Sequence, residues 1–150
     1  MQYEERLSRL LPGTWKLESR IDVTRSGQRR SDPLLGEDPV ALLIYDRSGH
    51  FAAQFMKRDR STLAPEVSNS PANNTFAQGG YDAYFGTYSV DDATGVVVQR
   101  LEAALTPANV GMALTRSMQV RANRLVIRLD TIAADGAPIV RTLTWRRLSS

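Results

Sequence analysis

Glu102 and Arg116 form the charged pair with the clearest potential for chemistry. They lie on two predicted strands, residues 96–105 and 112–121, joined by a loop centred near Asn109. An antiparallel register that turns about Asn109 places Glu102 opposite Arg116, with apolar residues on either side. Inside a closed sheet, such a pair could orient a polar substrate group or serve as acid and electrophile. The alternative is an exterior salt bridge worth under about 1 kcal/mol.

His50 is the only histidine, and it follows a predicted turn. Imidazole titrates near neutral pH, so His50 could act as a general base or ligand hydrogen-bonder at a barrel rim. A structural role beside the turn is the alternative. Gln54 and Met56 share its face on the predicted strand 50–56 and would extend a pocket wall. With one histidine and no cysteine, we expect no metal site and no cofactor.

Residues 81–91 are aromatic and alternate with the period of a strand. Tyr84 and Tyr88 share a face with Gly86 between them, and glycine leaves room for a ligand or a close backbone. Tyrosine offers an apolar body and one hydroxyl, which suits a flat, partly oxygenated ligand. Packing in the core is the alternative. The candidate ligand-binding residues are Tyr45, Gln54, Met56, Tyr84, Tyr88, Asn109 and Met118; the candidate catalytic residues are Glu102, Arg116, His50 and Tyr88.

Eight strands must position these side chains. Alternation is cleanest over residues 13–24, where Trp15, Leu17, Ser19, Ile21 and Val23 share one face. Mostly short turns make consecutive strands antiparallel, and closing them into an up-and-down barrel removes the sheet edges. An open sheet curved over a helix is the alternative. The predicted strands are residues 13–24, 39–45, 50–56, 81–91, 96–105, 112–121, 124–132 and 138–147.

Two segments fall outside the strands. Residues 4–11 predict a short helix, with its leucines on one face, that plugs a barrel end. Residues 57–80 form a long loop, in which Ser70 and Pro71 resemble a helix start and predict two helical turns over residues 71–78. A helical lid over a cavity is the functional interpretation, and a solvated connector is the alternative.

The composition is that of one ordinary globular domain spanning residues 1–150. Hydrophobic residues make up 42% and charged residues 23%, and the net charge is +3. The basic residues are scattered, which argues against nucleic-acid binding. No apolar run approaches the roughly 20 residues of a membrane span, and the charged first residues lack a signal-peptide core. We therefore expect a cytoplasmic protein without a membrane partner.

Gly13-Thr14-Trp15, following a short helix, resembles the start of the lipocalins and other calycins. In lipocalins a late arginine crosses the face of that tryptophan, and here either Arg146 or Arg147 is in place to do so. The chain more closely resembles a bacterial and fungal lipocalin-like domain family of small cytoplasmic proteins. The motifs that carry this resemblance are Gly-Glu-Asp-Pro at 36–39, Leu-Ile-Tyr at 43–45, Gly-His at 49–50, Ala-Gln-Phe-Met at 53–56, Tyr-Phe-Gly-Thr-Tyr at 84–88 and Val-Gly at 110–111.

The resemblance implies an all-β, eight-stranded antiparallel lipocalin-like barrel with an internal pocket, and no particular reaction. That family often carries histidines after the aromatic strand, where this chain has Gln99 and Arg100. We expect a carrier of a small, largely hydrophobic molecule such as an aromatic or polyketide-like compound. A cofactor-independent isomerase or cyclase acting in the same cavity is the second hypothesis. An interaction module or homodimer using an exterior strand face is the third.

Overall fold

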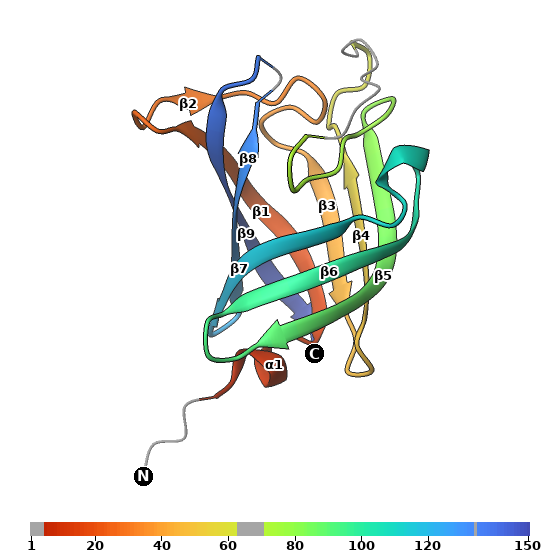
Figure 1. Ribbon diagram of the computed structural model, residues 1–150, viewed down its shortest axis with the longest axis vertical. Coiled ribbons are helices and arrows are strands. Elements are labelled where there is room, and N and C mark those ends of the chain that lie inside the picture. Colours follow the sequence, from red (N-terminus) through yellow and green to blue (C-terminus); the bar gives the residue numbers. More distant parts are fainter. Residues whose placement is uncertain (1–4, 63–70, 134) are drawn as a thin grey trace.

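The computed structural model describes residues 5–62, 71–133 and 135–150, which form a closed antiparallel barrel (Figure 1). The strands are hydrogen-bonded in the order β2-β1-β3-β4-β5-β6-β7-β8-β9, and β1 also pairs with β9. The eight-stranded barrel prediction is confirmed; β2 is only a two-residue extension of the sheet beside β1. The elements are α1 (Leu7–Leu10), β1 (Gly13–Thr24), β2 (Arg29–Arg30), β3 (Val40–Tyr45), β4 (His50–Met56), β5 (Tyr81–Asp91), β6 (Val96–Ala104), the 3₁₀ turn η1 (Pro107–Asn109), β7 (Ala113–Arg121), β8 (Arg124–Ile132) and β9 (Pro138–Ser149).

The short helix α1 lies at one end of the barrel, against β5 and β7 (Figure 1). Trp15 is fully buried above it and donates its indole N–H to the carbonyl of Leu11 at 3.0 Å. The Arg147 guanidinium lies 4.2 Å from the Trp15 ring and donates to the carbonyls of Pro12 and Leu10. Arg147 is therefore the arginine that closes this end of the barrel, called here the floor, whereas Arg146 is exposed.

A β-bulge divides β1 into two halves. The pairing with β9 shifts between Leu17 and Ser19, so the inward face changes there. Beyond the bulge Arg20 and Asp22 are buried, while Ile21 is 36% exposed. The prediction of one continuous apolar face along this strand was therefore wrong after Leu17. The bulge gives the floor end of β1 an apolar inner face and the other end a charged one.

A second register shift lies where β5 meets β6. Phe85 pairs with Ala103 and Gly86 with Leu101, which leaves Glu102 as the extra residue. A Cβ on Gly86 would lie 1.8 Å from the carbonyl oxygen of Arg100. Gly86 is thus required by the close approach of two backbones, one of the two expected reasons for a glycine in this strand.

The inner faces of the strands supply the core. Phe51, Ala53 and Phe55 of β4 point inward, and the ring of Phe55 meets that of Trp145 edge-on at 5.7 Å. The ring of Tyr45 meets that of Tyr88 in the same way at 4.9 Å. Within the described residues, no helix is both long and apolar enough to cross a membrane.

The second half of the long loop, residues 71–78, is called here the mouth segment. It contains turns and no helix, so the predicted helical turns were wrong; residues 63–70 of the predicted lid lie outside the described residues. In place of helical hydrogen bonds, carbonyls of the mouth segment accept hydrogen bonds from side chains of the barrel. The Thr131 hydroxyl donates to the Ala72 carbonyl at 2.9 Å, and the Thr106 hydroxyl donates to the Phe76 carbonyl at 3.2 Å. Asn74 to Ala77 are all buried. The mouth segment is thus part of the packed structure.

The mouth segment fills a gap in the wall. β7 and β8 pair only over residues 117–121 and 124–128 of the described chain, and they diverge beyond (Figure 1). There the Asn73 side chain donates to the Thr115 carbonyl at 3.1 Å and accepts from the Thr115 N–H at 2.9 Å. Since Thr131 of β8 holds the neighbouring Ala72, the segment bridges the two separated strands.

Candidate functional site

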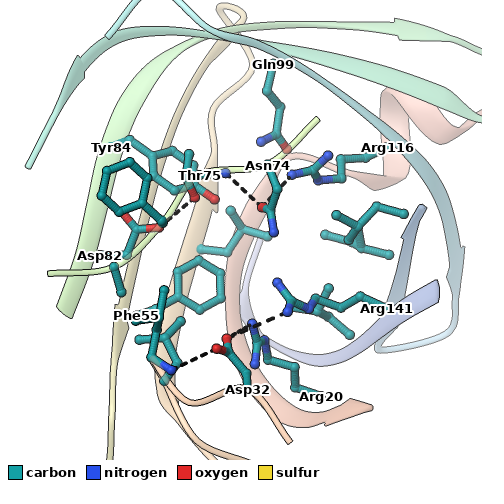
Figure 2. A pocket seen from close by; sticks show the side chains of 18 of the residues that line it. Arg20, Asp32, Phe55, Asn74, Thr75, Asp82, Tyr84, Gln99, Arg116 and Arg141 are labelled. Carbon is teal, nitrogen blue, oxygen red and sulfur yellow. Dashed lines mark hydrogen bonds and ion pairs between the residues drawn. The ribbon is translucent and has the colours of Figure 1, made fainter. Parts of the chain in front are cut away.

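A cavity lies inside the barrel beside the mouth segment (Figure 2). It offers about 60 Å³ to the centres of water-sized atoms. One water needs roughly 10–15 Å³ on this measure, so a small organic molecule is the right size. The apolar part of the lining includes Leu43, Phe55, Ile127, Leu143 and Trp145, and the polar part includes Arg20, Asp32, Asn74, Thr75, Asp82, Gln99, Arg116 and Arg141.

One side of the cavity carries a charge-balanced ion-pair network. Arg20 contacts Asp32 at 2.6 Å, and Arg141 binds both oxygens of Asp22 at 2.8 and 3.0 Å. Arg141 also lies 3.6 Å from Asp32, which joins the two pairs. Burial alone would raise the pKa of Asp32, but the charges of Arg20 and Arg141 outweigh it and hold that pKa below its ordinary value. Two cations and two anions therefore satisfy one another here.

Arg116 enters the cavity from β7 and is only 5% exposed. Its Nη1 donates to the carbonyls of Asn73 and Thr115 at 2.9 and 3.0 Å, and its Nη2 donates to Asn74 Oδ1 at 3.3 Å. All three acceptors are neutral, and Arg116 forms no ion pair with a carboxylate in the described part of the chain. Burial lowers the pKa of Arg116, yet a guanidinium keeps its proton in proteins.

Asp82 of β5 lies elsewhere in the lining and is 3% exposed. One oxygen, Oδ2, accepts from the Thr75 hydroxyl at 2.6 Å, whereas Oδ1 has no hydrogen-bond partner among the described residues. Burial raises the pKa of Asp82 to about 6, against the opposing effect of the Thr75 hydrogen bond. Asp82 can therefore exchange a proton near neutral pH.

Two further polar groups in the lining are incompletely bonded. The buried indole N–H of Trp145 has no acceptor among the described residues, unlike that of Trp15. The Gln99 Oε1 accepts from the Tyr45 hydroxyl, and the Gln99 amide nitrogen has no partner in the described chain. Burial raises the pKa of Tyr45 and of Tyr84, so both phenols stay protonated. The site thus offers several donors and one carboxyl oxygen to a bound molecule.

Of the residues predicted from the sequence, Arg116, Tyr45 and Tyr84 line this cavity. Glu102 does not: it is exposed, and Val97 is the residue that pairs with Arg116. The predicted interior ion pair between Glu102 and Arg116 was therefore wrong. The expected register failed because residues 105–112 form an asymmetric loop with η1. Glu102 lies on the outer face because Val97, Gln99 and Leu101 take the inner face of β6.

Most of the other candidates lie away from the cavity. His50 sits at the exposed end of the β3–β4 hairpin, with its Nδ1 2.8 Å from Ser48 Oγ and its side chain 60% exposed. Gln54 and Met56 occupy the outer face of β4, where Gln54 accepts from the Tyr81 hydroxyl. The predicted pocket wall was therefore placed on the wrong face of β4, since the phenylalanines on the other face point into the barrel.

The last three candidates do not line the cavity themselves, although Asn109 and Met118 contact residues that do. Tyr88 is half-buried and donates its hydroxyl to the Asp46 carbonyl. Asn109 is fully buried and donates to the Phe76 carbonyl at 3.3 Å, so it helps to hold the mouth segment. Met118 is buried with its Sδ 3.9 Å from the Tyr45 hydroxyl.

Sequence reasoning missed most of the polar lining. Asp82 could have been found, because it shares the face of Tyr84 in the alternating aromatic strand. Arg141 likewise shares a face with Leu143 and Trp145. Arg20 gave no such signal, since the β1 bulge reverses the face on which it lies.

Comparison with known proteins identifies the family of this barrel. Residues 12–148 match the family model of the lipocalin-like domain. The chain belongs to the lipocalin-like domain family. Among solved structures, this lipocalin-like domain is similar to bovine odorant binding protein in complex with a selenium-containing odorant. The two are 14% identical with a TM-score of 0.46, over all of this chain and 77% of the other. The domain matches no curated protein.

Proposed function

We propose that this lipocalin-like domain binds a small molecule with a largely apolar body inside its barrel. The observation that carries the proposal is the pair of orphan polar atoms, Asp82 Oδ1 and Trp145 Nε1, which belong to residues lining one cavity. Buried polar atoms are nearly always hydrogen-bonded in folded proteins. A molecule that bonds to them while covering the aromatic and aliphatic wall would supply the missing partners.

The dimensions of the barrel support the same function. Barrels of eight strands leave an interior wide enough for side chains or for one small ligand. Here the side chains leave about 60 Å³ for atom centres, so the bound molecule is of single-ring or short-chain size. The wall of Phe55, Leu143 and Trp145 accounts for its apolar body.

Native mass spectrometry of the protein purified from its own host tests this function. We expect a bound small molecule, lost in Ala77→Leu, which adds carbon atoms at a buried position in the cavity lining. Ala113→Leu, at an exposed position of β7, is the matched control and should keep the molecule. Protein that carries nothing, and that binds no compound from a library of small aromatic and aliphatic molecules, would contradict the proposal.

A second candidate function is proton-transfer catalysis on the bound molecule, as in a cofactor-independent isomerase or cyclase. The observation that favours it is Asp82, a buried carboxyl in the cavity with a pKa of about 6. Asp82 would act as the base, and Arg116 would stabilise negative charge as it develops. Glu102, His50 and Tyr88 do not line the cavity, so these roles pass to Asp82 and Arg116.

The pH dependence of turnover separates the two functions. An enzyme that uses Asp82 as a base would gain activity as the pH rises through about 6, and Asp82→Asn would abolish that activity with the bound molecule retained. A carrier would release the same molecule unchanged after incubation at any pH. Chemical analysis of the released compound therefore decides between them.

A further inference from the structure

One of the three arginines that line the cavity forms no ion pair within the described residues. Arg20 and Arg141 are matched by Asp22 and Asp32 in the ion-pair network. Arg116 is a further buried cation whose described partners are all neutral oxygens. A buried charge without a counter-ion is costly, and a bound anion removes that cost.

Arg116 also has hydrogen-bonding capacity left over. A guanidinium carries five N–H donors, and three of its hydrogen bonds are made to the protein. The N–H of Nε and one N–H of Nη2 have no partner among the described residues. The Gln99 amide points into the same cavity (Figure 2), and its nitrogen is also unpartnered within the described chain.

Among the described residues that line the cavity, the other charged side chain is Asp82. Its carboxyl is held by Thr75, and because its pKa is about 6 it is mainly neutral below that pH, where it does not oppose an anion. The phenols of Tyr45 and Tyr84 lie close enough to Arg116 to interact with its charge and are themselves neutral. The surroundings of Arg116 thus suit an acceptor with negative charge.

We infer that the cavity recognises an oxyanion, in the first instance a carboxylate, through the free donors of Arg116 and the Gln99 amide. This rests on the proposed binding function and adds the chemical class of the ligand. The apolar remainder of the molecule lies on Trp145 and Phe55. Small aromatic and short aliphatic carboxylic acids have both parts at the right size.

The two tryptophans provide an internal reporter for the test. The indole N–H of Trp145 belongs to a cavity-lining residue, whereas that of Trp15 is bonded to Leu11 in the floor. In ¹⁵N NMR spectra of the full chain, a ligand in the cavity should shift the Trp145 indole signal and leave that of Trp15 unmoved. The compounds to titrate are benzoate against benzyl alcohol, and hexanoate against 1-hexanol.

We expect each carboxylate to bind about ten- to hundredfold more tightly than its neutral partner, as a charge-assisted hydrogen bond would give. Arg116→Gln should remove this preference, and Arg100→Gln, on the exposed face of β6, should keep it. Arg116→Lys retains the charge and should keep part of the preference. The comparison of carboxylate with alcohol in the unchanged protein stands even if the Arg116 variants fail to fold.

The outcomes separate this inference from the binding function. Equal binding of acid and alcohol, or a preference that survives in a folded Arg116→Gln protein, would overturn the anion site and leave the carrier function standing. If the protein purified from its host carried a bound molecule without an acidic group, the anion site would likewise be overturned and the carrier function would stand. If none of the four compounds shifts the Trp145 signal, the anion site is overturned, and the host-purified protein then decides the binding function separately.

Discussion

Asn73 and Thr115 exchange two hydrogen bonds in the way that residues of adjacent strands do. The Asn73 amide group takes the place of a backbone peptide, donating to the Thr115 carbonyl at 3.1 Å and accepting from its N–H at 2.9 Å. A single side chain thus completes the ladder of β7 where β8 has turned away. The integrity of the barrel wall at the mouth depends on a loop residue.

Removing the Asn73 side chain should weaken the barrel wall at the mouth. Asn73 has a φ of 53°, so Asn73→Gly deletes the side chain without straining the backbone. We expect a loss of about 1–3 kcal/mol in the free energy of unfolding, because two hydrogen bonds to the Thr115 backbone are lost, each worth about 0.5–1.5 kcal/mol. Hydrogen exchange at the Thr115 amide should accelerate far more than at the Leu125 amide on β8. Unchanged exchange at Thr115 would contradict the bridging role.

A methyl group at position 86 should be poorly tolerated. The Cβ of Gly86→Ala would lie 1.8 Å from the Arg100 carbonyl oxygen, so β5 and β6 must separate at the bulge. We expect a loss of about 3 kcal/mol or more in the free energy of unfolding. Urea denaturation measures it. Gly27→Ala is the control: nothing lies within 4 Å of its Cβ, so only its positive φ costs about 1 kcal/mol. Equal losses in the two variants would refute the close-approach explanation.

Asp82 should make stability depend on pH. Its pKa is about 6 in the folded protein against 3.8 ordinarily, so between these values the folded state holds a proton that the unfolded state has released. The folded state is therefore penalised as the pH rises, reaching about 3 kcal/mol above pH 6. Asp82→Asn should gain stability relative to the unchanged protein between pH 3.5 and pH 7 by roughly this amount.

Denaturation curves of both proteins across that pH range test the assignment. Thr75→Val provides a second check, because loss of the hydroxyl should raise the pKa of Asp82 further and move the transition to higher pH. A stability difference between Asp82→Asn and the unchanged protein that does not vary with pH would show that Asp82 is not the group responsible.

Arg147 should stabilise the floor in a way that Arg146 does not. Arg147→Met removes the contact with the Trp15 ring and the hydrogen bonds to Leu10 and Pro12. We expect a loss of about 2–4 kcal/mol in the free energy of unfolding and faster hydrogen exchange at the Leu11 amide. Arg146→Met, at the exposed neighbouring position, should change either quantity little. Similar effects from both variants would contradict the assignment.

The sequence predicts the barrel well because alternation and turns are local properties. The β4 strand shows the limit of such local prediction. One of its faces carries His50, Gln54 and Met56, the other carries Phe51 and Phe55, and only the closed barrel determines that the phenylalanines lie inside. Alternation also cannot reveal a bulge. A single extra residue in β1 turned Arg20 inward, and in β6 alternation could not tell whether the face of Glu102 or that of Leu101 lies inside, which is why the site was predicted only in part.

Arg116 was predicted as an interior residue with the wrong partner. Its position follows from the apolar face that it shares with Leu114 and Met118. Its real partners, Asn73 and Asn74, lie some forty residues away in a segment without strand or helix periodicity, and no local pattern could have brought them together.

The pairing of β1 with β9, including Thr14 beside Ser149, makes the order of strands around the wall a ring. A ring has no obligatory starting point, so the chain could be opened elsewhere and still trace the same barrel. A circular permutant joined by a short linker between the β9 and α1 ends, and cut in the exposed turn at Arg47 and Ser48, should fold around the same interior. Folding of this permutant would show that the barrel does not require its strands to follow one another in the native chain order.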